Sequence, residues 1–324
     1  MIIVTLSLVS KEFVLAAHPQ SVSMTLPNFL IIGAMKAGTT SLYSYLAQHP
    51  QIYMSPVKEP RFFAPEARSS RSSSESDRAT NDYAYVDQLD AYCALFSDVS
   101  DEIAIGEASP LYIYSPQAPE QIQQHIPDVK LIAILRDPAE RAFSHFMHVW
   151  RSGREPLDDF AAALAAEEHR IQNNWSTLWH YRQRGFYGQQ LTRYFDRFSS
   201  SQIKVFLSED LRLHPSKTLK EIFQFLEVDD TFETNFSHNR NVAKQVPKNK
   251  RLHQLLTQKN SLKDFLKPLM PARFRRRLRE NVTRSNLTKP QLSPEIRRQL
   301  MSDYRDDILH AQTLIQRDLS HWLR

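Results

Sequence analysis

Four short runs of apolar residues recur along the chain, each bounded by polar or turn-forming residues. They cover residues 28–33, 103–107, 130–135 and 202–207. Runs of about four to eight such residues are typical of strands that are buried on both faces. The longer stretches between them carry apolar residues at the i, i+3, i+4 spacing of helices. Strands that alternate with helices predict an α/β fold with three layers, in which helices flank a central parallel sheet.

The first apolar run leads into a loop at residues 34–38 and then into a helical pattern. We expect Thr39 or Thr40 to cap this helix, which would continue to about His49 before Pro50 ends it. Leu42, Tyr45 and Leu46 supply its apolar face at the i, i+3, i+4 spacing of a helix. The pattern therefore predicts a strand, a tight loop and a helix in direct succession.

The remaining organisation follows from composition. We expect residues 1–24 to form a disordered leader and residues 25–324 to form a single domain. Residues 68–80 (RSSRSSSESDRAT) are too polar and serine-rich to pack, which favours a loop. From about residue 247 the chain is basic and helical, interrupted by prolines.

Charge and cysteine content limit the classes of function. Cys93 is the only cysteine, so no disulfide can form within the chain, and we expect a cytoplasmic protein. Residues 240–298 hold 17 Lys or Arg against 3 acidic residues, which suggests an anionic ligand or surface, or else solvated helix faces. No metal-ligand cluster, nucleic-acid motif or transmembrane run is predicted.

The loop after the first strand has the chemistry of a phosphate site. Gly33-Ala-Met-Lys36-Ala-Gly38-Thr39 lies between a predicted strand and a predicted helix. There backbone N–H groups and the positive end of the helix can face an anion, and Lys36 adds a charge. In a Walker A loop the lysine follows the second glycine, where Thr39 stands here, so an ordinary ATPase or GTPase is disfavoured.

A second strand ends in charged residues. Residues 130–135 run into Arg136-Asp137-Pro138, and the following helix places Asp137, Glu140, Arg141, Ser144 and His148 on its polar face. Arg136 and Ser144 are placed to hold one phosphate together. The alternative is that Arg136 only pairs with a neighbouring carboxylate.

A third segment, Lys58-Glu59-Pro60-Arg61-Phe62-Phe63, places an acid beside two aromatic residues. A partly buried carboxyl should have a raised pKa, in the range of a general base. The alternative is a salt bridge from Glu59 to Lys58 or Arg61.

The sequence GAMKAGTTSLYSYLAQHPQI resembles the phosphosulfate-binding loop of sulfotransferases that use 3′-phosphoadenosine 5′-phosphosulfate (PAPS). The heparan-sulfate-type and related bacterial enzymes are the most similar members. The resemblance implies a P-loop-like domain without a metal, which binds PAPS and its product adenosine 3′,5′-bisphosphate (PAP). It assigns Glu59 as base and Lys36 as catalytic residue, and where Arg61 stands the family often has histidine. It assigns donor binding to Lys36, Ala37, Gly38, Thr39, Thr40 and Ser41, and the 3′-phosphate to Arg136 and Ser144.

The predicted function is therefore in-line transfer of a sulfuryl group from PAPS to an acceptor hydroxyl or amine, with a saccharide among the candidate acceptors. Two alternatives are a nucleotide-dependent kinase of P-loop type and a nucleotide-binding protein that has lost its catalytic activity. Residues 106–112 (GEASPLY), at the end of the second apolar run, resemble the segment that lines the family's active-site cleft. Neither the acceptor nor the oligomeric state is predicted.

Overall fold

The computed structural model describes residues 25–65, 85–237, 246–247, 287–288 and 290–324. The expected leader, the serine-rich loop at residues 68–80 and most of the basic stretch between residues 240 and 289 lie outside the described residues. The predictions for those three segments therefore stay predictions.

A five-stranded parallel sheet forms the centre of the molecule, in the order β2-β3-β1-β4-β5. Its strands are β1 (Phe29–Gly33), β2 (Ile52–Met54), β3 (Ala104–Ala108), β4 (Lys130–Leu135) and β5 (Ile203–Leu207). The predicted α/β fold is confirmed, and four strands lie at the apolar runs. The sequence did not indicate β2, because three residues are too few to show a period.

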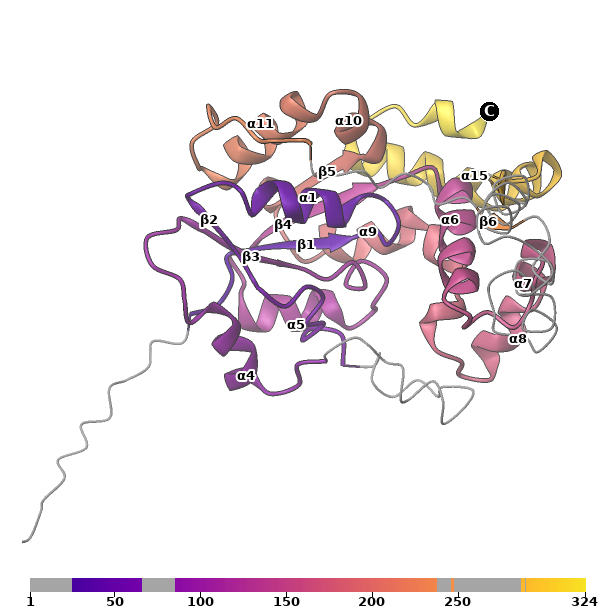
Figure 1. Ribbon diagram of the computed structural model, residues 1–324, viewed down its shortest axis with the longest axis horizontal. Coiled ribbons are helices and arrows are strands. Elements are labelled where there is room, and N and C mark those ends of the chain that lie inside the picture. The colour runs from indigo at the N-terminus through magenta and orange to yellow at the C-terminus, as the bar shows by residue number, and fades with distance from the viewer. Residues whose placement is uncertain (1–24, 66–84, 238–245, 248–286, 289) are drawn as a thin grey trace, which may run out of the picture.

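Helices cover both faces of the sheet (Figure 1). Above it in this view lie α1 (Thr39–Leu46), α10 (Ser208–Leu213) and α11 (Pro215–Leu226), and below it lie α4 (Leu89–Cys93) and α5 (Ala118–His125). Helix α6 (Pro138–Arg151) leaves the carboxyl end of β4 and leads to α7 (Phe160–Ala165) and α8 (Glu167–Gln172). The remaining elements are α9 (Tyr187–Phe195), α15 (Pro294–Ile315), the antiparallel pair β6 (Val246–Pro247) and β7 (Leu287–Thr288), and the 3₁₀ turns η1 (Ala94–Phe96), η2 (Thr177–Trp179), η3 (Gln183–Gly185), η4 (Ser200–Gln202) and η6 (Ser320–Leu323).

The last helix closes the fold against the middle of the chain. Helix α15 packs on α9, and Arg317 just beyond it pairs with Asp210 of α10 at 2.5 Å. Trp322 of η6 is buried, and its indole N–H donates to Glu209 at 3.1 Å. Within the described residues, no helix combines the length and the apolar character that crossing a membrane requires.

The expected cap and the expected end of the first helix were both wrong. Helix α1 begins at Thr39 after an N-cap at Gly38, whose φ of 114° suits glycine, and no threonine side chain caps it. The helix ends at Leu46, before the expected His49.

Arg141, which we expected on the polar face of α6, is not exposed there. Its side chain is fully buried and donates to the backbone oxygen of Tyr181, because η2 and η3 pack over that side of the helix.

Candidate active site at the carboxyl ends of β1 and β4

The loop between β1 and α1 brings several backbone amides to one place. Lys36 adopts a left-handed φ of 69°, and Ala37 donates its N–H to Ala34 at 3.1 Å. The internal hydrogen bonds of α1 begin with Leu42 N–H to Gly38 O at 3.1 Å. The amides that precede Leu42 in the first turn therefore lie at the positive end of the helix, where an anion is favoured. Ala37, by contrast, already uses its amide within the loop.

The carboxyl end of β4 lies beside this loop. Arg136 donates to the backbone oxygen of Lys36 at 3.4 Å and to Glu140 at 3.3 Å, and about a third of its side chain is exposed. Asp137 caps α6 by accepting the N–H groups of Ala139 and Glu140, both at 3.0 Å. The pairing with a nearby carboxylate, which the sequence left as an alternative, is thus present, and it leaves the guanidinium beside the loop. Ser144 lies half-buried on α6, two turns further along.

Glu59 lies on the segment that follows β2 and is bound on both sides. Lys58 Nζ lies 2.8 Å from its Oε1, and Arg61 Nη2 lies 2.7 Å from its Oε2. Arg61 in turn donates to the hydroxyl of Tyr85 at 3.1 Å. Burial alone would raise the pKa of Glu59, but Lys58 and Arg61 outweigh it, and the pKa is held below its ordinary value. The expected raised pKa is therefore wrong, and the salt bridges predicted as the alternative are present.

Electrostatics show that these segments meet at one site. Burial lowers the pKa of Lys36, the positive charges of Arg136 and Arg151 lower it further, and the charge of Glu59 acts in the opposite direction. Such mutual effects require charges that lie near one another in a poorly solvated place. The structure thus places Arg136 beside Lys36, and the charge of Glu59 acts on Lys36 as well, while the roles of these residues stay predictions.

His148 of α6 belongs to the same site, although no role was assigned to it from the sequence. Burial lowers its pKa to about 4, with Lys36 and Arg154 acting in the same direction and Glu59 against them. The imidazole is therefore neutral at pH 7. The signal was present in the sequence, because His148 follows Ser144 by four residues and so lies one turn further along the same helix face.

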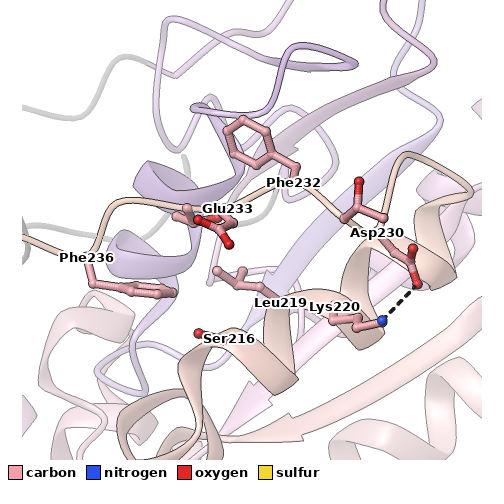
Figure 2. Close-up of a pocket in the computed structure, with 9 residues that line it drawn as sticks. Ser216, Leu219, Lys220, Asp230, Phe232, Glu233 and Phe236 are labelled. Atoms are coloured by element: carbon pink, nitrogen blue, oxygen red, sulfur yellow. Dashed lines mark ion pairs between the residues drawn. The ribbon is translucent and has the colours of Figure 1, made fainter.

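A cavity of about 410 Å³ lies elsewhere, between α11 and the segment that follows it (Figure 2). Leu219 and Phe236 supply apolar walls, and Lys220 pairs there with Asp230 at 3.7 Å. None of its lining residues is a predicted site residue. Among the described residues, no group of three or more His, Cys, Asp or Glu side chains is arranged to hold a metal ion.

The chain is similar to known proteins in both sequence and structure. A family model described as the sulfotransferase family matches residues 27–233. Bifunctional heparan sulfate N-deacetylase/N-sulfotransferase 4 of Mus musculus is 30% identical over 214 residues, which make up 63% of this chain and 22% of that protein. Membrane-associated sulfotransferase kil1 of Dictyostelium discoideum is 35% identical over 152 residues, or 45% of this chain and 28% of that protein. The chain therefore spans only about a quarter of the length of these relatives.

Among solved structures, a sulfotransferase from Alicyclobacillus acidocaldarius matches with a TM-score of 0.72 and 33% identity. The match covers 93% of this chain and 100% of that one. The family model extends from before β1 to beyond α11 and includes both the Lys36 loop and the Arg136 turn. Because this family model covers more than half of the sequence, the chain belongs to the sulfotransferase family.

Proposed function

We propose that the protein transfers a sulfuryl group from PAPS to a hydroxyl or amine of an acceptor. The observation that carries the proposal is the position of Lys36 and Arg136 at the carboxyl ends of parallel strands. Arg136 donates to the backbone oxygen of Lys36, and the charges of Arg136 and Glu59 both act on the Lys36 ammonium. A nucleotide with anionic groups suits the cationic loop and helix terminus, and Glu59, which Lys58 and Arg61 keep ionised, is placed to accept a proton.

The proposed reaction forms a bond between the acceptor atom and sulfur, and breaks the bond between sulfur and the bridging phosphate oxygen. Glu59 takes the acceptor's proton, and Lys36 stabilises the negative charge that develops on the bridging oxygen. The amides at the start of α1 hold the 5′ side of the donor, while Arg136 and Ser144 hold its 3′-phosphate. Such transfers need positioning and charge stabilisation more than covalent help from the protein.

The two ion pairs of Glu59 keep it ionised and therefore able to accept a proton. Lys58 binds one carboxylate oxygen and Arg61 binds the other, but each oxygen has a second lone pair. A lowered pKa makes Glu59 a weaker base, so proton transfer should be late, when the leaving phosphate already carries much of its charge.

The acceptor is proposed to be a saccharide, on the ground that one relative is named a heparan sulfate N-sulfotransferase. Neither hydroxyl nor amine is favoured by the geometry, since a carboxylate can accept a proton from both. The cytoplasm remains our proposed compartment, on the basis of the single buried Cys93.

The test has two parts. The protein is first titrated with PAP in the presence of a chelator, with adenosine 5′-monophosphate as the matched ligand. It is then incubated with PAPS and a panel of saccharides, and the products are examined by mass for added sulfuryl groups. Tight, metal-independent PAP binding with transfer supports the proposal. Binding that requires Mg²⁺ would favour the kinase, and binding without transfer to any acceptor would favour a protein that has lost its activity.

A further inference from the structure

The segment that carries Glu59 is held to the sheet by three backbone N–H groups. Glu59 donates to the carbonyl oxygen of Ala108 at 3.1 Å, and Arg61 donates to the hydroxyl of Ser109 at 3.1 Å. Phe63 donates to the hydroxyl of Tyr112 at 3.4 Å. Two of the three acceptors are thus side-chain hydroxyls on the segment that follows β3. Residues 58–63 are called the base loop below.

The base loop does not adopt a relaxed conformation. Glu59 and Arg61 have φ values of 64° and 57°, in the left-handed region that is unfavourable for residues with a side chain. Each such residue costs on the order of 1 kcal/mol or more, so the surroundings must hold it in place. Those surroundings include the three hydrogen bonds, the two ion pairs of Glu59, and the N–H of Val86, which donates to the carbonyl oxygen of Pro60 at 3.0 Å.

A buried carboxyl lies beneath the two hydroxyls. Glu107 is fully buried on β3, and the nearby hydroxyls of Tyr112 and Ser109 favour its ionised form, while its Oε2 accepts no hydrogen bond within the described residues. A third hydroxyl, that of Tyr92 on α4, donates to its Oε1 at 3.5 Å. A hydroxyl has one proton, so Ser109 and Tyr112 can accept from the base loop and donate to Glu107 at the same time.

We propose that Glu107 is a positioning residue, which orients the hydroxyls of Ser109 and Tyr112 so that they accept the N–H groups of Arg61 and Phe63 and hold Glu59 in place for proton transfer. A carboxylate suits this task because it only accepts hydrogen bonds. If Glu107 is protonated or replaced by glutamine, it presents a donor, and at least one of the three hydroxyls must turn its oxygen toward that donor. Where that hydroxyl belongs to Ser109 or Tyr112, its oxygen is drawn away from the N–H group of the base loop, and the loop loses part of its fixed geometry.

A pH dependence follows. Burial raises the pKa of Glu107 to about 7, and the charge of Glu59 raises it further, while the hydroxyls of Tyr112, Ser109 and Tyr92 act against this. Burial also raises the pKa of Tyr92 and Tyr112 well above their ordinary value, so both stay protonated. His125 of α5 packs on Phe62 and Phe63 and is the imidazole on this side of the loop. Turnover should therefore rise as the pH passes through about 7 and Glu107 ionises.

The experiment replaces Glu107 by glutamine and rests on the sulfotransferase activity proposed above. We expect kcat at saturating PAPS to fall at least ten-fold, PAP affinity to stay within two-fold, and the rise of kcat near pH 7 to disappear. His125→Gln should keep that rise. Glu167→Gln is the matched control, because Glu167 is also buried and accepts two backbone N–H groups, from Arg182 and Gln183, away from the site. It should lower the unfolding temperature but preserve kcat and its pH profile.

Hydrogen exchange gives a second readout, which needs no turnover. In Glu107→Gln and in the milder Ser109→Ala, the amides of residues 61–63 should exchange at least ten-fold faster, while those of β4 stay unchanged. Unchanged exchange in both variants would overturn the proposal, and so would a Glu107→Gln enzyme whose kcat and pH profile match the parent. If the parent itself transfers no sulfuryl group, the proposed function fails, and the exchange rates still decide whether Glu107 positions the loop.

Discussion

Replacing Lys36 by alanine should remove most of the activity and leave the fold intact. Lys36 is held between β1 and α1, where burial lowers its pKa and the charges of Arg136, Arg151 and Lys58 lower it further, against the opposite effect of Glu59. In the free protein the charged form of the Lys36 side chain is therefore destabilised. It becomes favourable only when an anionic ligand, and above all the charge of a transition state, compensates it.

The expected magnitude follows from this arrangement. Removing one well-placed donor from a developing negative charge costs about 100- to 1,000-fold in kcat, or about 3–4 kcal/mol. Stability should change little, because Lys36 already has a φ of 69° and alanine would bear a similar strain. Loss of the repulsion between Lys36 and the side chains of Arg136 and Arg151 should slightly stabilise the free protein.

The assay measures kcat at saturating PAPS together with the urea midpoint of unfolding. Lys130→Ala is the matched control. Lys130 is the first residue of β4, at the amino ends of the strands and so away from the site, and it pairs with the exposed Glu227 at 2.8 Å. So exposed a pair contributes little to stability, and kcat should not change. A fall of only a few-fold in Lys36→Ala, at an unchanged urea midpoint, would remove Lys36 from the mechanism.

Three further predictions concern the same site. Glu59→Gln should keep PAP affinity within a few-fold and lose at least 100-fold in kcat, because an amide oxygen cannot take the acceptor's proton; lost binding at unchanged turnover would make Glu59 structural. Arg136→Ala and Ser144→Ala should each weaken PAP binding about ten-fold or more and leave adenosine 5′-phosphosulfate binding nearly unchanged, and equal losses would contradict the assignment to the 3′-phosphate. Because the pKa of Glu59 is lowered in the native state, its stabilisation should be present above about pH 4.5 and be lost as the pH falls through the native pKa. The difference in unfolding free energy between parent and Glu59→Gln should accordingly close in acid, and a constant difference from pH 7 to pH 3 would refute this.

The elements that bind the donor could be predicted because each is continuous in the sequence. The loop from Gly33 to Ser41 lies directly between a buried strand and its helix, and Arg136 ends a second buried strand. Parallel strands bring their carboxyl ends to one edge, so two local patterns were enough to place Lys36 and Arg136 together. The three-residue strand β2 was missed because nothing in so short a segment distinguishes it from a turn.

The environment of Glu59 could not be predicted, because it depends on folding rather than on neighbours in the sequence. Phe62 and Phe63 suggested an apolar environment and a raised pKa. In the structure both aromatic rings pack instead around Tyr92, and the left-handed turns at Glu59 and Arg61 fold two cations onto the carboxylate. Glu107 lies in the segment at residues 106–112 that resembles the family's cleft, but its burial against Tyr92 of α4 could not be predicted from its neighbours in the sequence.

The ion pair between Asp137 and Arg297 provides a last prediction, on how the end of the chain supports the site. The two carboxylate oxygens of Asp137 have separate tasks: Oδ1 caps α6, and Oδ2 accepts from Arg297 of α15 at 2.7 Å. Because the cap does not use Oδ2, Arg297→Ala should cost only about 1 kcal/mol of unfolding free energy, as expected for a partly exposed pair. The cap would still hold α6, so PAP affinity should stay within two-fold. Asp137→Ala removes both contacts and should lower stability and PAP affinity together.

Urea unfolding and PAP titration of the two variants measure both effects, and the exposed neighbour Arg298 offers a control in Arg298→Ala. The cap belongs to the turn that carries Arg136, so the affinity of Asp137→Ala reports on that turn, whereas Arg297→Ala reports on the docking of α15. If Arg297→Ala instead lost as much PAP affinity as Arg136→Ala, the ion pair rather than the cap would be what fixes Arg136. Helix α15 would then control donor binding from 160 residues further along the chain.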